Sequence, residues 1–238
     1  MQEFTIEIAG VPARIRCRYA ESRRFFGDYI SDKPPLFTVE PDAADSERMR
    51  TASGGASAAA SGFLAEIGAV HRLLAERMTE YGVLLMHGSA LCMDGEAYIF
   101  IAPSGTGKST HARLWRETFG DRVWMINDDK PMLRIGDNGV TVFGTPWDGK
   151  HRLSRNACAP LKAVVWLTRD RTNHIEPLSR AEAFPLLLRQ CYTSKRPETM
   201  ARILAMEKTL LDSSAFYSLG CTTDPEAAVT AWQGMQRG

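Results

Sequence analysis

Two segments near the start of the chain alternate hydrophobic and polar residues, which is the pattern of a strand with one buried face. The first alternation covers residues 4–8 and the second covers residues 15–19. Gly10-Val11-Pro12 between them predicts a turn, so we expect a β-hairpin. Because side chains alternate along a strand, one face of the second strand carries three arginines, which favours a solvated edge-strand face over an anion site. These arginines are Arg14, Arg16 and Arg18.

The middle of the chain predicts a helix and then an antiparallel pair of strands. Within residues 63–81, apolar side chains recur every three or four positions, as on the buried face of a helix. The apolar residues 83–86 predict a strand. Residues 91–93 and 96–102 flank Asp94-Gly95, a dipeptide favoured in two-residue hairpin turns. Such a short turn forces its two strands to pair antiparallel.

The rest of the chain alternates predicted strands and helices, so the expected fold class is α/β (α+β), with a mixed, partly antiparallel sheet and flanking helices. Ser179 and Glu182 form a capping-box pattern, and Pro185 in the same segment predicts a kink or a later helix start. The expected strands cover 122–127, 133–143 (as a hairpin), 161–168 and 216–219. The expected helices cover 108–118, 179–192, 198–211 and a last segment with Asp224 as its N-cap and Pro225 as its first residue.

A run of small residues, 51–62 (TASGGASAAASG), divides the chain into two predicted parts. Residues 1–62 form a β-rich N-terminal segment that ends in this linker or loop, and residues 63–238 form the larger domain. Of the 238 residues, 44% are hydrophobic and 24% are charged, close to the averages of soluble globular proteins. A chain of this length and composition is expected to bury a hydrophobic core.

Charge and cysteine usage narrow the classes of partner. The formal net charge is +1, which argues against a dedicated nucleic-acid-binding protein. No apolar stretch approaches the ~20 residues that a membrane-spanning helix needs, so we expect no membrane partner. The five cysteines are odd in number and far apart in the sequence, which favours reduced thiols and a cytoplasmic location. A homo-oligomer is compatible with these features, and the sequence does not specify the oligomeric state.

The segment after the second strand of the predicted hairpin carries the strongest chemical signal. Glycines allow backbone amides to turn toward a ligand, and the N-terminus of the following helix adds a partial positive charge. The pattern matches the phosphate-binding loop G-x-x-x-x-G-K-[ST], except that Ala102 stands in the place of the first glycine. We therefore expect a nucleotide, ATP with Mg²⁺, at this loop. The predicted nucleotide-binding residues are Ser104, Gly105, Thr106, Gly107, Lys108, Ser109 and Thr110.

Two adjacent acids, Asp128 and Asp129, follow the next predicted strand. Nucleotide-binding proteins place at this position an acid that holds Mg²⁺ directly or through water. A pair of carboxylates offers one ligand for the metal and one base for an attacking hydroxyl. A plain turn-capping role for one of them is the structural alternative.

Both motifs and the hairpin together resemble the catalytic domain of HPr kinase/phosphorylase and its relative phosphoenolpyruvate carboxykinase. In HPr kinases a His-Gly pair precedes the hairpin, the loop reads Gly-x-Ser-Gly-x-Gly-Lys-Ser, and an Asp-Asp pair ends the next strand. The matching residues are His87-Gly88, 102–109 and Asp128-Asp129, and the resemblance covers roughly residues 84–131. The first third of the chain does not resemble the N-terminal domain of HPr kinases, so the resemblance does not extend to HPr as the acceptor.

The resemblance implies a kinase that transfers the γ-phosphate of ATP to a hydroxyl of a peptide, a protein or a small molecule. It implies Asp128 as the base near the acceptor, Ser109 and Asp129 as metal-binding residues, and His87 beside the transferred phosphate. For His87, an ordinary hydrogen-bonded histidine at a strand end remains an equal alternative. Lys108 would contact the β- and γ-phosphates.

A basic loop, residues 144–155, is a further candidate. Its Gly, Pro and Gly residues fix an irregular backbone, and it resembles a Gly-Thr-Pro-Trp loop of uncharacterised bacterial relatives of HPr kinase, some of which lie beside peptide-modification genes. Three of its cations could neutralise a transferring phosphoryl group, although a merely exposed basic loop is the alternative. The three predicted clamp residues are Lys150, Arg152 and Arg155.

Two other functions remain open at the level of sequence. A non-catalytic nucleotide-binding sensor or partner subunit of a peptide-modification system would keep the same loop without turnover. A small-metabolite kinase outside the HPr kinase group predicts parallel strands on both sides of the strand that precedes the loop, so an antiparallel hairpin there would exclude it.

Overall fold

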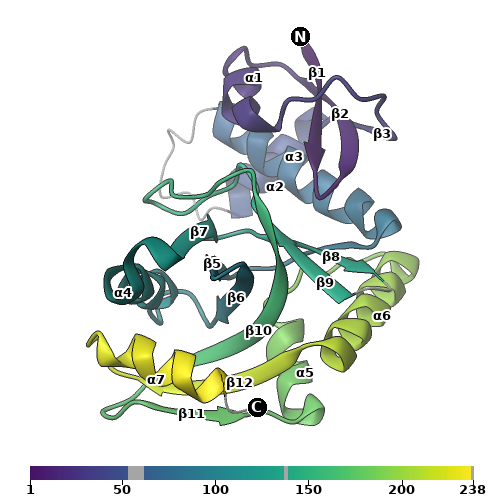
Figure 1. The fold of residues 1–238 in the computed structure, drawn as a ribbon. Coiled ribbons are helices and arrows are strands. Elements are labelled where there is room, and N and C mark those ends of the chain that lie inside the picture. The colour runs from purple at the N-terminus through teal and green to yellow at the C-terminus, as the bar shows by residue number, and fades with distance from the viewer. Residues whose placement is uncertain (53–61, 137–138, 237–238) are drawn as a thin grey trace. The chain divides into compact units, whose positions relative to one another are not determined.

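The computed structural model describes residues 1–52, 62–136 and 139–236. These residues form two compact units, Met1–Tyr81 and Gly82–Gly238 (Figure 1). The predicted boundary lies after residue 62, and residues 53–61 of the predicted small-residue linker lie outside the described residues. The helix that follows belongs to the first unit, because its buried Glu66 accepts the backbone N–H groups of Arg18 at 3.0 Å and Tyr19 at 3.4 Å.

The first unit contains a three-stranded sheet in the order β1-β2-β3. The turn between β1 and β2 lies at Ala9-Gly10, with φ of 52° and 72°, one residue before the predicted position. Arg16 donates to Glu3 at 2.7 Å and Arg14 lies 3.6 Å from the same carboxylate, so two of the three ladder arginines are paired with an acid on their own surface. The elements are β1 Gln2–Ile8, β2 Val11–Cys17, α1 Glu21–Phe26, η1 Gly27–Tyr29, β3 Phe37–Val39, α2 Ala43–Ala52, α3 Gly62–Met78 and η2 Thr79–Tyr81.

The second unit is built on one nine-stranded, curled sheet (Figure 1). Its main path runs β4-β8-β9-β10-β6-β5-β7, and β12 joins β10 and carries β11. The strands are β4 Val83–Leu85, β5 Ser89–Met93, β6 Glu96–Ile101, β7 Val123–Asn127, β8 Met132–Gly136, β9 Gly139–Phe143, β10 Cys158–Arg169, β11 His174–Pro177 and β12 Ala215–Cys221.

Strand β6 has one antiparallel and one parallel neighbour. It pairs antiparallel with β5 across the Asp94-Gly95 turn, where φ is 52° and 88°, and parallel with β10. The predicted hairpin is therefore confirmed, and the mixed α/β architecture with it. A kinase with parallel strands on both sides of β6 is excluded. Of the second predicted hairpin, β8 and β9 pair antiparallel as expected, and residues 137–138 of its turn lie outside the described part.

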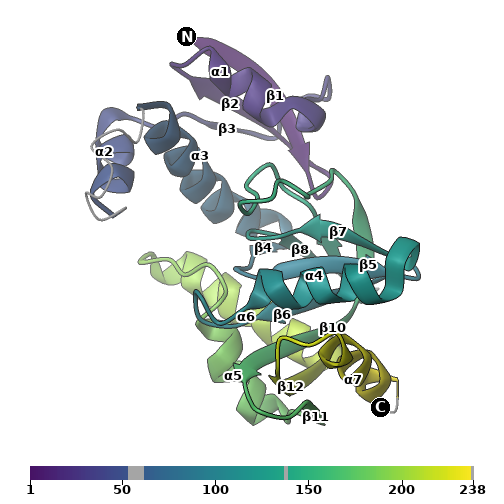
Figure 2. The same ribbon diagram turned by 90° about the vertical axis from the view of Figure 1, so that its left-hand side faces the viewer.

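Helices cover both faces of this sheet because the strands alternate apolar side chains to either side. On β6, Ala97, Ile99 and Ile101 pack in a core with α5 and α6, while Tyr98 and Phe100 pack in a second core with α4 and α7. Figure 2 shows α4 lying across β5 and β6. The helical elements are α4 Lys108–Phe119, η3 Gly120–Arg122, α5 Arg180–Leu188, α6 Pro197–Ser213 and α7 Glu226–Met235.

Helix α5 has the predicted capping box, but it does not begin later because of Pro185. The Ser179 hydroxyl accepts the Glu182 N–H, and the Glu182 carboxylate accepts the Ser179 N–H, which completes the capping box. The helix begins at Arg180 with Pro185 inside it, so the predicted later start is wrong; the cap fixes the start, and the helix instead ends early, at Leu188. None of the helices formed by the described residues is long and apolar enough to cross a membrane.

Candidate active site

The predicted phosphate-binding segment lies between the end of β6 and the start of α4. Gly105 and Gly107 have φ of 79° and 128°, in the region that favours glycine. A Cβ placed at either position would meet no heavy atom within 4 Å, so open space lies beside the loop. The N-terminus of α4 directs its unpaired backbone N–H groups and its partial positive charge toward that space.

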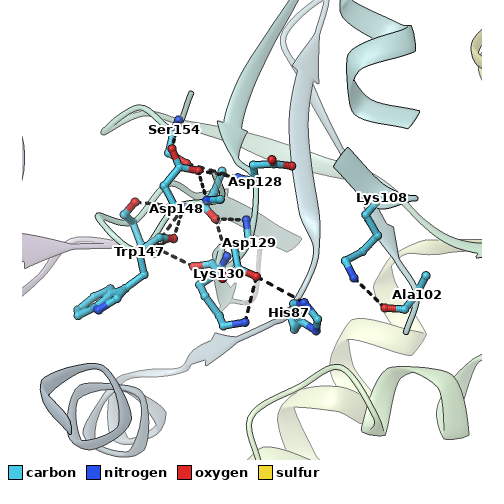
Figure 3. Close-up of polar contacts among 12 residues, drawn as sticks. His87, Ala102, Lys108, Asp128, Asp129, Lys130, Trp147, Asp148 and Ser154 are labelled. Carbon is cyan, nitrogen blue, oxygen red and sulfur yellow. Dashed lines mark hydrogen bonds and ion pairs between the residues drawn. The ribbon is translucent and has the colours of Figure 1, made fainter. Parts of the chain in front are cut away.

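Lys108 begins α4 and is only 9% exposed. Its Nζ donates to the Ala102 carbonyl at 2.9 Å, back across the loop (Figure 3). Burial lowers the pKa of this ammonium, while the charges of Asp129 and, more weakly, Asp128 oppose that change. The lysine is therefore anchored on the loop, and the charges of the acid pair act on it from a distance.

Arg169, at the end of β10, supports the same loop from the other side. Its guanidinium donates to the carbonyl of Gly105 at 2.6 Å and to that of Thr106 at 3.1 Å. Parallel pairing of β10 with β6 brings the C-terminal ends of both strands to one edge of the sheet, which places the arginine there. Sequence reasoning missed this residue, because no local motif surrounds it.

Asp128 follows β7 and is buried, with 7% of its surface exposed. Its Oδ1 accepts a hydrogen bond of 2.7 Å from the Ser89 hydroxyl, which antiparallel pairing of β5 with β7 brings alongside. Its backbone N–H lies 3.3 Å from both Asp148 Oδ1 and Ser154 Oγ (Figure 3). The carboxylate is thus fixed by the neighbouring strand, and its backbone by the basic loop.

Asp129 points in a different direction. Its Oδ1 lies 3.1 Å from Lys130 Nζ and 3.4 Å from His87 Nε2 (Figure 3). The Asn127 side chain accepts the backbone N–H groups of Asp129 at 2.9 Å and Lys130 at 2.6 Å, which fixes the turn after β7. Asn127 and Lys130 are not among the predicted site residues, although both flank the acid pair directly.

His87 lies beside the acid pair as predicted, and its surroundings hold it neutral. Burial lowers its pKa to about 4, and the positive charges of Lys130 and Lys108 act in the same direction, against the opposing effect of Asp129. Its backbone N–H donates to the Gln190 carbonyl at 2.7 Å. At neutral pH the imidazole can therefore donate a hydrogen bond to Asp129 without carrying a charge.

The loop of residues 144–155 packs closely on the turn after β7. The Asn127 amide donates to the carbonyls of Thr145 at 3.1 Å and Trp147 at 3.2 Å. A Cβ at Gly149 would lie 2.7 Å from Asp128 Oδ2, so only glycine permits this approach. The backbone of the predicted basic loop is therefore part of the site.

The three cations predicted as a clamp are placed differently from one another. Lys150, Arg152 and Arg155 are all exposed, and Arg152 has φ of 49°. The Arg155 guanidinium lies 5.6 Å from the centre of the Trp124 ring. Within the described part of the chain, no hydrogen bond or ion pair joins these side chains to Asp128 or Asp129, so their role as a clamp stays a prediction.

A cleft of about 330 Å³ joins the start of α4 to Asp128. Ser109 and Thr110 of the predicted loop and Asp128 all line it, which brings residues of both motifs to one space. The other lining residues are Ala112, Arg113, Arg116, Met125, His151 and Leu153.

Neither a family model nor a curated protein matches the chain by sequence. A solved structure is similar to it. This is the HPr(Ser) kinase/phosphatase from Coxiella burnetii, with 8% sequence identity and a TM-score of 0.37, over 64% of this chain and 97% of that chain. At so low an identity and TM-score, the likeness carries neither the activity nor the residue roles of that protein to this chain.

Proposed function

We propose that the protein is a Mg²⁺-dependent kinase that transfers the γ-phosphate of ATP to a hydroxyl group of a peptide, a protein or a small molecule. One observation carries this proposal: Ser109, at the end of the glycine loop, and Asp128, at the end of β7, line the same cleft. A nucleotide bound at the loop would therefore present its phosphate to the same space as the carboxylate that would act as base.

The glycine loop and Lys108 would hold the phosphates of ATP. The backbone N–H groups of the loop and of the first turn of α4 are the natural donors to phosphate oxygens. The Lys108 ammonium would exchange its bond to the Ala102 carbonyl for the β- and γ-phosphates. Arg169 would keep the carbonyls of Gly105 and Thr106 turned away from them.

The residues present also fit a magnesium ion bound with the nucleotide. Mg²⁺ in such sites takes one or two protein oxygens and completes its shell with phosphates and water, so it needs no cage of protein ligands. The described residues contain no cluster of three or more His, Cys, Asp or Glu residues that would favour a different, fully protein-bound metal. Ser109 and Asp129 would hold the ion, which neutralises charge on the phosphates when bound.

Asp128 would receive the proton of the acceptor. The acceptor oxygen forms a bond to the γ-phosphorus, the bond from that phosphorus to the bridging oxygen breaks, and ADP leaves with the electron pair. The products are ADP, the phosphate ester and a proton on Asp128, which passes to water. Ser89 would orient the carboxylate through its 2.7 Å hydrogen bond.

The test is transfer from γ-labelled ATP to a panel of peptide, protein and small hydroxyl acceptors. We expect Mg²⁺-dependent labelling, and Asp128→Asn should reduce it by roughly 10²- to 10⁴-fold with nucleotide binding kept. Asp94→Asn is the matched control, because Asp94 is exposed at a hairpin turn and its φ of 52° suits asparagine. Equal labelling by wild type and Asp128→Asn would contradict the role of Asp128. Nucleotide binding without transfer to any acceptor would favour a sensor or partner subunit.

A further inference from the structure

The cleft continues beyond the proposed transfer centre along one face of α4. Ser109, Arg113 and Arg116 are spaced by four and three residues, so they share that face. Side chains on a helix lean toward its N-terminus, which favours a tilt of Arg116 toward Ser109, whereas Arg113 turns toward Glu117. The loop residues His151 and Leu153 line the same cleft.

The two arginines differ in what they already bind. The Arg113 guanidinium donates to both carboxylate oxygens of Glu117, at 2.8 Å each, on the exposed surface of the helix. Arg116 makes no ion pair with any residue in the described part of the chain, and its Nε is buried there without a hydrogen-bond partner. A guanidinium remains charged at all ordinary pH values, so a partly buried and unpaired one favours an anion.

We propose that the acceptor carries an anionic group, a carboxylate or a phosphate, which Arg116 binds with help from Arg113 while the acceptor hydroxyl lies at Asp128. This inference rests on the proposed kinase function and names the substrate class of that site. Ser109 and Arg116 are two helical turns apart, or about 10 Å along the axis, so hydroxyl and anion belong to one compact group. The volume of about 330 Å³ lies at the small end of ligand pockets and suits such a group.

Binding of matched acids and neutral analogues tests this proposal without requiring turnover. The full chain, labelled with ¹⁵N-arginine and ¹⁵N-glycine and saturated with Mg²⁺ and a non-hydrolysable ATP analogue, is titrated while the Arg116 Nε–Hε resonance is followed by NMR. N-acetylserine is compared with its N-methylamide, and glycerol 3-phosphate with glycerol; the two pairs separate a carboxylate from a phosphate. Filling the glycine loop with nucleotide prevents the probes from binding there.

We expect at least one anionic probe to shift the Arg116 resonance and to bind at least tenfold more tightly than its neutral partner. Arg116→Gln should remove that preference, and Arg113→Gln should reduce it less. Arg122→Gln is the matched control, because Arg122 is exposed and already paired with Asp94. A charge-conserving Arg116→Lys assigns the resonance and should keep part of the affinity.

Three results would each overturn the anion site. They are equal affinities for charged and neutral probes, unchanged affinity in Arg116→Gln, and no shift of the Arg116 resonance with either anion up to tens of millimolar. None of these results would contradict the proposed kinase function. That function is contradicted separately if the nucleotide analogue does not shift the Gly105 and Gly107 amide resonances.

Discussion

Glu207 is a fully buried acid on α6, 0% exposed, beside the thiol of Cys191. Burial raises its pKa from 4.5 to about 7, and the pKa of the neighbouring thiol lies well above its usual value for the same reason. A carboxyl with this pKa is largely protonated in the folded protein at mildly acidic pH. The core of the second unit thus contains an acid that its surroundings keep neutral.

The stability of the protein should fall as pH rises through the pKa of Glu207. In the unfolded chain this carboxyl loses its proton near pH 4.5, whereas the folded state retains it up to about pH 7. The favourable contribution is therefore complete below 4.5 and lost as pH approaches and passes 7. The loss should be on the order of 3 kcal/mol.

Glu207→Gln should remove this pH dependence and unfold at higher urea concentration than wild type at pH 8, but not at pH 5. Urea unfolding at a series of pH values measures the unfolding free energy of each variant, with Glu176→Gln on the exposed surface of β11 as control. Parallel pH profiles for wild type and Glu207→Gln would show that the glutamate is not responsible.

At the scale of elements, β10 and β6 determine the conformation of the glycine loop through Arg169. Without the guanidinium, the carbonyls of Gly105 and Thr106 lose their donors and the loop samples other conformations. Arg169→Ala should therefore raise the Kd for Mg²⁺-ATP roughly tenfold, or about 1.4 kcal/mol, and leave the unfolding free energy nearly unchanged. Calorimetric titration measures the Kd.

Arg171→Ala is the matched control for this prediction, because Arg171 is an exposed arginine just beyond the end of β10. A normal Kd in Arg169→Ala would mean that the loop keeps its conformation without the arginine.

The sequence predicts the features that local residues specify, and it does not predict those that depend on pairing between distant strands. The hairpin of β5 and β6 followed from Asp94-Gly95 because a two-residue turn specifies its own pairing. The position of β10 beside β6 could not be predicted in this way, because no local pattern in residues 158–169 specifies which strand pairs with β10. Arg169 and Ser89 reach the candidate site through such long-range pairings, whereas Lys108 and Asp128 were visible within their motifs.

At the scale of the whole molecule, the chain forms two compact units, and every residue of the proposed site belongs to the second. The second unit contains two cores, one on each face of its sheet. The first unit, Met1–Tyr81, buries its own apolar side chains, such as Phe4, Ile6 and Ile15. Units with separate cores can unfold separately, which gives ligand binding a readout that distinguishes them.

Mg²⁺ with a non-hydrolysable ATP analogue should stabilise the second unit selectively. At a free ligand concentration 100 times the Kd, binding adds about 2.7 kcal/mol to the stability of the unit that holds the ligand. For a unit of this size that corresponds to a rise in Tm of roughly 5–10 °C. Differential scanning calorimetry should show one transition moving and the other fixed. Gly107→Ala should lose the rise, because an alanine is strained at φ of 128° in the proposed phosphate loop. A rise in Tm of the first unit alone would mean that the nucleotide binds elsewhere. An unchanged rise in Tm in Gly107→Ala would mean the same.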